Sequence, residues 1–381
     1  MNEANPKFFN IILGAGFSKA MAELPISKEI DELIFQDSSR LKELYNYLKG
    51  KDEKHNFETI IHELRSYKTC ENIRNFFHKE LSAEKSDELV QELTKKTSEV
   101  LTSTLDIKYE KIKKELSPLF IQFLELLVGN SFHINIFDLN FDNVFESTIQ
   151  NSNLKNHYYD FYDFHTEGFK CPYFNYPLAS LIINPFTINS KTDQKQCYRE
   201  YANGFFNKEL TSEKIDKDLN NLNNRRIHHY KLHGSLYEYY GCGETERKRS
   251  LLFKDKVSST QVGAERFYIT GGNKFNYLRD YHTKHLFKIL QIYSPFDTLT
   301  IGYSFNDLHV ECMADITISA RNQSKEGFSP IQFFWQNRPG KYNTGELINK
   351  INGLIENNNR RDFYLEQFLK EITLNDQREI K

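Results

Sequence analysis

The sequence lacks any pairing of cysteines. Its five cysteines are odd in number, widely scattered and never arranged as C-x-x-C: Cys70, Cys171, Cys197, Cys242 and Cys312. Disulfide-rich secreted domains and cysteine-ligated zinc sites both depend on cysteines at regular spacings. We therefore expect neither a disulfide framework nor a bound zinc ion, which fits a protein of the reducing cytosol.

Long hydrophobic runs are also missing. No stretch approaches the ~18 consecutive apolar residues that a membrane-spanning helix needs. The apolar run at residues 8–13 is short, contains Asn10 and ends in glycine, which favours a buried strand over a signal peptide. We expect a cytoplasmic protein that does not contact a membrane.

No charge of one sign dominates the chain. Its 50 lysine and arginine residues are balanced by 52 aspartate and glutamate residues, for a formal net charge of −2. Proteins that recognise nucleic acids through their overall field are strongly basic. The balance therefore argues against direct nucleic-acid binding.

Apolar and aromatic residues, in contrast, are plentiful. Hydrophobic residues make up 39% of the chain and aromatic residues 14%, which is enough for a substantial core and excludes a disordered or fibrous protein. The 381 residues can form one large domain with insertions or two modest domains. The sequence contains no internal repeat and no low-complexity linker.

The most informative segment is Gly14-Ala15-Gly16-Phe17-Ser18, which directly follows the apolar run at residues 8–13. Glycine lets a backbone turn tightly and approach a pyrophosphate, and a helix N-terminus directs N–H groups at it. We expect a helix to open at Ser18. The third glycine of the usual dinucleotide-binding pattern is replaced by Lys19, so the dehydrogenase fingerprint is broken.

The order of strand and helix patterns predicts an α/β fold, with a Rossmann-like, mostly parallel sheet flanked by helices and a helical insertion lobe. Further strands are expected at residues 134–137, 229–232, 298–303 and 331–335. We expect one domain over residues 1–340, with its core at 1–27, 130–150 and 227–340, a helical insertion at 28–129 and an irregular insertion at 151–226. Residues 341–381 are predicted to form a C-terminal helical extension.

Polar residues suited to chemistry follow the predicted strands. They are the Gly14 turn, Asn140 and Asp142 after the second strand, His233 after the third, and Gly302, Ser304 and Asp307 after the fourth. In open α/β sheets, ligands bind outside the carboxyl ends of the strands. The four strand ends are therefore expected to form one site.

In this order, the four segments resemble the NAD-binding core of the sirtuin superfamily, and above all the sirtuin-like NAD hydrolases of bacterial anti-phage defence. The turn at residues 14–18 is similar to the family's G-A-G-x-S, and Asn140-Phe141-Asp142 to its N-[IVY]-D step. Leu232-His233-Gly234 is similar to the catalytic L-H-G, and the segment from Gly302 to Asp307 to the late G-x-S turn and its following aspartate.

The resemblance implies that NAD is the substrate and that its nicotinamide–ribose bond is hydrolysed. It makes Asn140 and His233 catalytic, with His233 as the general base and Asn140 holding the water or the ribose. Cofactor contacts are implied for Gly14, Ala15, Gly16, Phe17, Ser18, Asp142, Gly302, Ser304 and Asp307. It also implies a homo-oligomer and, in two-gene systems, a HerA-type hexameric ATPase as partner.

The chain departs from the deacylating sirtuins in two places. It has no four-cysteine zinc ribbon, and Pro25 is followed by Ile26, Ser27 and Lys28 where those enzymes have an acidic residue and an arginine. These differences weaken the hypothesis of an NAD-dependent protein deacylase. A second alternative is a regulatory subunit that binds NAD or ADP-ribose without cleaving it.

Each candidate residue also has a purely structural interpretation. His233 could be a structural histidine at a strand end, one of 12 histidines. Asn140 could form an Asx turn that caps the following helix. Asp142 could simply complement the first turn of that helix.

Overall fold

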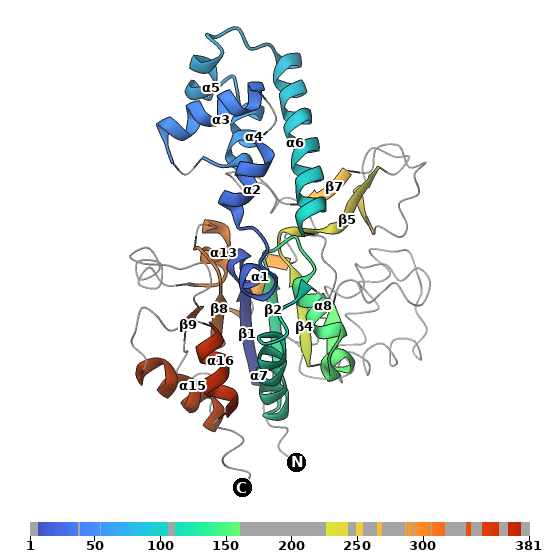
Figure 1. The fold of residues 1–381 in the computed structure, drawn as a ribbon, viewed down its shortest axis with the longest axis vertical. Helices are drawn as coiled ribbons and strands as arrows, with labels where there is room; N and C mark the ends of the chain where they lie inside the picture. Colours follow the sequence, from blue (N-terminus) through green and yellow to red (C-terminus); the bar gives the residue numbers. More distant parts are fainter. Residues whose placement is uncertain are drawn as a thin grey trace.

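The protein folds around one six-stranded sheet with helices on both faces (Figure 1). The computed structural model describes residues 7–36, 39–53, 55–105, 111–160, 226–242, 249–253, 265–268, 286–287, 289–291, 293–305, 307–316, 333–336, 345–357 and 365–374. Among these residues, no helix is both long and apolar enough to cross a membrane.

The sheet confirms the predicted α/β class. Its strand order is β3-β4-β2-β1-β8-β9, and all neighbouring strands run parallel except the last pair, β8 and β9. The strands are β3 (Tyr158–Asp160), β4 (Ile227–Lys231), β2 (Phe132–Asp138), β1 (Lys7–Leu13), β8 (Thr298–Ile301) and β9 (Phe333–Gln336).

Strand β1 lies in the middle of the sheet and is buried on both faces. Phe9 and Ile11 belong to one apolar cluster, whereas Phe8 and Ile12 belong to the other. This alternation is the two-residue period of a strand. The polar Asn10 is satisfied across the sheet, because its side chain donates to the carbonyl of Tyr293 and accepts from the Asn135 amide.

Helices cover both faces of the sheet. The first apolar cluster joins it to α1 (Ala15–Ala22), α7 (Ser117–Gly129), α8 (Val144–Gln150), α15 (Glu346–Asn357) and α16 (Leu365–Leu374). The second joins it to α13 (Leu308–Met313) and to four residues that precede β8: Leu286, Phe287, Ile289 and Leu290. Phe123 of α7 contacts both Phe9 of β1 and Phe368 of α16, with ring centroids 6.2 and 5.5 Å apart. The predicted C-terminal helical segment is thus part of the sheet's cover.

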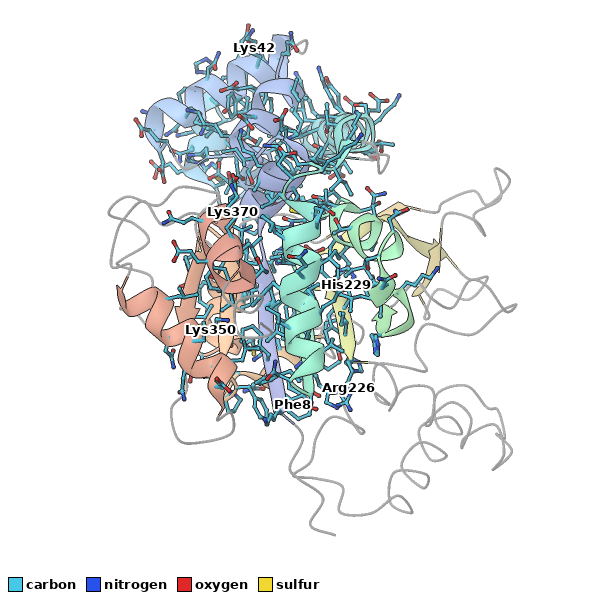
Figure 2. The ribbon with its side chains drawn as sticks, turned by 60° about the horizontal axis from the view of Figure 1, so that its bottom comes forward. Phe8, Lys42, Arg226, His229, Lys350 and Lys370 are labelled. Atoms are coloured by element: carbon cyan, nitrogen blue, oxygen red, sulfur yellow. The ribbon has the colours of Figure 1, made fainter. Side chains whose placement is uncertain are left out.

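A helical lobe stands beyond the carboxyl ends of the parallel strands (Figure 1). It consists of α2 (Ser27–Ile34), α3 (Ser39–Lys51), α4 (Phe57–Arg65), α5 (Glu71–Phe76) and α6 (Ala83–Leu105). Figure 2 shows Lys42 on this lobe and Phe8 and Arg226 at the opposite end of the molecule, where β1 and β4 begin. Helix α7, which also falls within residues 28–129, packs on β2.

A second, antiparallel sheet follows β4 and was not predicted from the sequence. It contains β5 (Gly234–Cys242), β6 (Arg249–Phe253) and β7 (Glu265–Tyr268). Strand β5 begins directly after His233. Most of the predicted irregular insertion at 151–226 lies outside the described residues, which include only the short helix η2 (Asn153–Asn156), β3 and Arg226 from its two ends.

A buried carboxyl group connects two helices of the lobe. The Asp31 side chain of α2 accepts a hydrogen bond from the N–H of Phe57, the first residue of α4, at 2.8 Å. Burial, reinforced by the nearby Glu58 and Glu32, raises the pKa of Asp31 to about 7, against the opposing effects of the Phe57 hydrogen bond and Lys49. Asp31 therefore binds its proton more tightly in the folded protein than in the unfolded chain.

This shift predicts a pH-dependent stability. Because the folded-state pKa is raised, the contribution of Asp31 is fully present below about pH 4 and is lost as the pH rises to about 7. Asp31→Asn keeps an acceptor for Phe57 but cannot ionise. In urea unfolding, its stability relative to the wild type should increase by about 2 kcal/mol between pH 5 and pH 7.5.

Glu88→Gln provides the control, since Glu88 is exposed on α6 and is not among the groups that shift the pKa of Asp31. Its stability relative to the wild type should change little over the same range. If the difference in unfolding free energy between Asp31→Asn and the wild type does not change with pH, the raised pKa of Asp31 is contradicted.

Candidate active site

The glycine turn after β1 is fastened to the turn after β8. The N–H of Gly14 donates to the carbonyl of Ile301 and that of Gly16 to the carbonyl of Gly302, both at 2.9 Å. A Cβ on Gly14 would lie 2.5 Å from the Gly302 oxygen, and a Cβ on Gly302, whose φ is +63°, would lie 2.1 Å from the Phe17 nitrogen. Both turns therefore require glycine.

Helix α1 begins at Ala15, earlier than the predicted start at Ser18. The Phe17 N–H donates to the Gly14 carbonyl, and the Gly16 N–H is held by the β8 turn. A phosphate at this turn would therefore meet the N-terminal end of α1 at Ala15 rather than the amides of Gly16 and Phe17.

Asn140 faces the glycine turn. Its side-chain amide donates to the carbonyl of Gly14 at 3.1 Å, which joins the end of β2 to the end of β1. The local turns are made by its neighbours instead: the Asp138 carboxylate accepts from the Asn140 N–H at 2.9 Å, and Asp142 accepts from the N–H of Val144 at 3.0 Å. The side-chain hydrogen bond at the start of α8 is therefore made by Asp142, and the Asn140 side chain points to the glycine turn.

A fully buried lysine organises this loop. The Lys231 ammonium, from the end of β4, donates to the Asp138 carboxylate at 2.8 Å, to the carbonyl of Asn140 at 3.1 Å and to the carbonyl of Asp142. It also pairs with Glu146 of α8 at 3.2 Å. One cation thus binds two carboxylates and the backbone on both sides of the loop from Asp138 to Asp142.

The charges of this cluster are set by their surroundings. Burial would lower the pKa of Lys231, but the surrounding carboxylates raise it above its ordinary value. Burial would raise the pKa of Asp138, but Lys231 and His229 hold it below its usual range. Burial raises the pKa of Asp142 despite the nearby Lys231, so Asp142 keeps a proton more readily than Asp138 does.

Three buried polar side chains lie at alternate positions along β4 and just after its end. His229, Lys231 and His233 alternate along the chain, and all are buried. His229, labelled in Figure 2, lies between the Tyr158 hydroxyl, 2.8 Å from Nδ1, and the Asp138 carboxylate, 3.2 Å from Nε2. His229 therefore supports the lysine cluster, as a structural histidine does.

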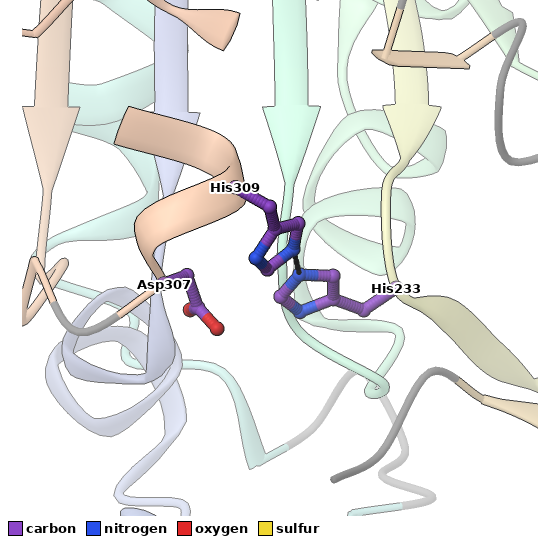
Figure 3. A group of neighbouring side chains, drawn as sticks. All are labelled: His233, Asp307 and His309. Carbon is purple, nitrogen blue, oxygen red and sulfur yellow. Dashed lines mark hydrogen bonds between the residues drawn. The ribbon is translucent and has the colours of Figure 1, made fainter. Parts of the chain in front are cut away.

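His233 faces a second histidine that the sequence analysis did not single out. Its Nε2 lies 2.9 Å from Nε2 of His309, in α13, and both rings are 3% exposed (Figure 3). Asp307, at the start of α13, has a carboxylate oxygen within 4.8 Å of one ring nitrogen of each histidine. The Phe287 ring packs on His309, with centroids 5.0 Å apart.

The strand ends predicted to converge are joined by contacts in two groups. The turn at residues 14–18 contacts Asn140 and Gly302, and His233 contacts the segment bearing Asp307 and His309. The loop between β8 and α13 carries both Gly302 and Asp307. It therefore links the glycine turn to the histidine pair.

Two other predicted residues have distinct surroundings. Ser304, in the same loop, is exposed. Asp142 is buried beside Ser18, whose hydroxyl makes no hydrogen bond of normal geometry, yet lies near enough to lower the pKa of Asp142 against the larger effect of burial.

The sequence analysis missed Asp138, Glu146, Lys231 and His309. A signal for Lys231 was present, because a charged residue between two histidines in a strand expected to be buried must find a partner. His309 carried no comparable signal, since it follows Asp307 by two residues in a helix too short to show periodicity.

Among the residues that the structure describes, two groups of side chains have the composition of a metal site: buried His233 and His309 with half-buried Asp307, and buried Asp138 with Glu146 and His229. In the second group the positive charge is already supplied by Lys231. In the first, the two nitrogens are spaced as a hydrogen bond. The geometry therefore assigns a metal to neither.

Comparison with known proteins leaves the site to be interpreted from its own chemistry. No protein-family model matches the chain, and no curated protein matches it.

Removing the buried ammonium should destabilise the fold. Lys231→Met leaves Asp138 and its neighbours without their cation, and breaking a buried ion pair typically costs about 3–5 kcal/mol. The free energy of unfolding in urea should fall by that amount. Lys370→Met is the control, because Lys370 pairs with Glu366 on the exposed surface of α16 and should lose about 0.5 kcal/mol or less. Equal losses would contradict a special role for Lys231.

The contact between the two turns predicts opposite effects for two glycine substitutions. Gly302→Ala meets the Phe17 backbone and strains a positive φ, so it should lower the free energy of unfolding by about 2 kcal/mol or more. Gly353→Ala, within α15 and with open space around it, should raise it by about 0.5–1 kcal/mol. Tolerance of alanine at position 302 would show that the two turns are not held in contact.

Proposed function

We propose that this chain is an NAD hydrolase that cleaves the bond between nicotinamide and ribose to give ADP-ribose. The observation that carries the proposal is the direct hydrogen bond from Asn140 to the Gly14 turn, at the carboxyl edge of a parallel sheet. His233 follows the neighbouring strand β4 at the same edge. The order of these motifs, which resembles that of sirtuin-like NAD hydrolases, names the substrate.

The reaction breaks the N-glycosidic bond, and nicotinamide leaves with the bonding electron pair. Positive charge then develops at C1′ of the ribose, water adds there through its oxygen, and one proton is released. Asn140 suits the positioning of the ribose or of the water, because its amide offers both a donor and an acceptor. His233 suits the removal of the proton, because a histidine titrates near neutral pH.

The remaining contacts would orient the dinucleotide. The N-terminal end of α1, at Ala15, would face the pyrophosphate, while Gly14 and Gly16 allow its close approach. Gly302, Ser304 and Asp307, from the loop after β8, would lie toward the adenosine half. Asp142, which is buried beside Ser18, would support the glycine turn from the protein interior.

The biological part of the proposal is depletion of cellular NAD during phage infection, in the cytoplasm. A toxic activity of this kind must be held off until it is triggered. We therefore include a homo-oligomer and a HerA-type hexameric ATPase as proposed partners. No zinc and no protein substrate are required for simple hydrolysis.

The test is release of nicotinamide from NAD by the purified protein, followed by liquid chromatography with and without the product of the neighbouring gene. His233→Ala and Asn140→Ala should each reduce the rate by at least about 100-fold while the protein remains folded, as checked by circular dichroism. His62→Ala on α4 and Asn151→Ala after α8 serve as matched controls and should retain the wild-type rate.

Two results would count against the proposal. Wild-type turnover by either site variant would remove the assigned catalytic role. Tight binding of NAD by calorimetry, without nicotinamide release in either condition, would favour the regulatory subunit instead.

A further inference from the structure

The contact between His233 and His309 constrains where their protons lie. The two Nε2 atoms are 2.9 Å apart in a buried environment, with the ring planes inclined by 29° (Figure 3). A hydrogen bond at this distance holds one proton, so one nitrogen donates and the other accepts. Two arrangements are therefore available, and they differ in which nitrogen of His233 carries a lone pair.

General-base chemistry selects one of them. When a histidine takes up a proton, both of its ring nitrogens become donors. If His233 already donates from Nε2 to His309, it can accept the new proton at Nδ1 without any rearrangement of the pair. In the opposite arrangement, two donors would face each other across 2.9 Å once His233 is protonated.

We propose that His309 is a positioning residue for His233: it accepts the Nε2 proton, fixes the ring and assigns the base to Nδ1. This inference rests on the proposed function. It also defines the resting tautomers, with His233 protonated at Nε2 and His309 protonated at Nδ1. His309 makes no contact with the reacting atoms in this scheme.

The surroundings of the pair support a fixed acceptor. His309 is held by the Phe287 ring on one side and by α13, whose first turn is closed by hydrogen bonds from the N–H groups of Val310 and Glu311 to the Asp307 carbonyl. An oxygen of the Asp307 carboxylate lies within 4.8 Å of one ring nitrogen of each histidine. A carboxylate at this range favours the imidazolium that forms on His233 during turnover.

A metal bridge explains the geometry less well. Zinc bonds to imidazole nitrogens at about 2.0–2.1 Å in a tetrahedron, which would separate the two nitrogens by roughly 3.3 Å. The observed separation is shorter and suits a shared proton. A bound metal would also occupy the nitrogens that the pair uses to hold its proton.

The first test reads the tautomers directly, without activity. In protein labelled with ¹⁵N-histidine, long-range ¹H–¹⁵N correlation spectra distinguish the two neutral tautomers, and spectra of His233→Gln and His309→Gln assign the signals. We expect His233 protonated at Nε2 and His309 at Nδ1. The reverse assignment would overturn the proposal.

The second test compares two substitutions of one residue. His309→Phe removes the acceptor, whereas His309→Gln retains an oxygen that can accept the proton. We expect His309→Phe to lower kcat for NAD by at least about 10-fold with KM changed less than 2-fold, and His309→Gln to recover most of the loss. A wild-type kcat for His309→Phe would overturn the positioning role.

Two controls separate the possible failures. If the wild type releases no nicotinamide under any condition, the proposed function fails. The spectra still show which histidine of the pair donates the shared proton. One equivalent of zinc in the wild-type protein, absent from His309→Phe by elemental analysis, would overturn the hydrogen-bonded pair in favour of a metal site.

Discussion

The geometry of the site depends on the ion pairs that the buried Lys231 ammonium forms with Asp138 and Glu146. The ammonium is removed from water and surrounded by the Asp138 and Glu146 carboxylates and by the carbonyls of the loop that carries Asn140. A buried charge is tolerated only when it is paired and hydrogen-bonded, so these partners cannot move independently. The ion pairs and hydrogen bonds of Lys231 therefore fix the backbone position of Asn140. The Asn140 side chain reaches the glycine turn without a bound ligand.

Steric contact fixes the other side of the site. Gly14 and Gly302 approach so closely that neither position has room for a side chain, and the turns after β1 and β8 behave as one unit. That unit continues through the β8–α13 loop to Asp307 and His309, and through them to His233. The ends of β1, β2, β4 and β8 are thus linked by a cation, by backbone contact and by a histidine pair, three physically different means of holding one edge of a sheet.

Much of this arrangement follows from the sequence. The strands β1 and β2 were predictable because each is a short, largely apolar run that ends at glycine or a polar residue, and the helical pattern of the lobe was equally clear. The shorter β4 and β8 were also expected, although both contain polar residues. The β5–β7 sheet and the partners of Lys231 and His309 were not predictable, because they depend on contacts between segments far apart in the chain. The early start of α1 has a local cause, since Gly14 serves as its N-cap while the pattern pointed to Ser18. The strands that carry the expected site residues were predictable, but which side chain meets which was not.

The central place of β1 has a consequence for synthesis of the protein. Asn10 leaves the ribosome long before Thr298, the residue 288 positions later to which it bonds. Contacts of such large separation form late, because the intervening chain must first be made and closed. A nascent polypeptide therefore cannot assemble the edge where the strand ends meet until translation has passed β8. If this chain destroys a coenzyme that its own host needs, the topology itself delays that capacity until β8 has been synthesised.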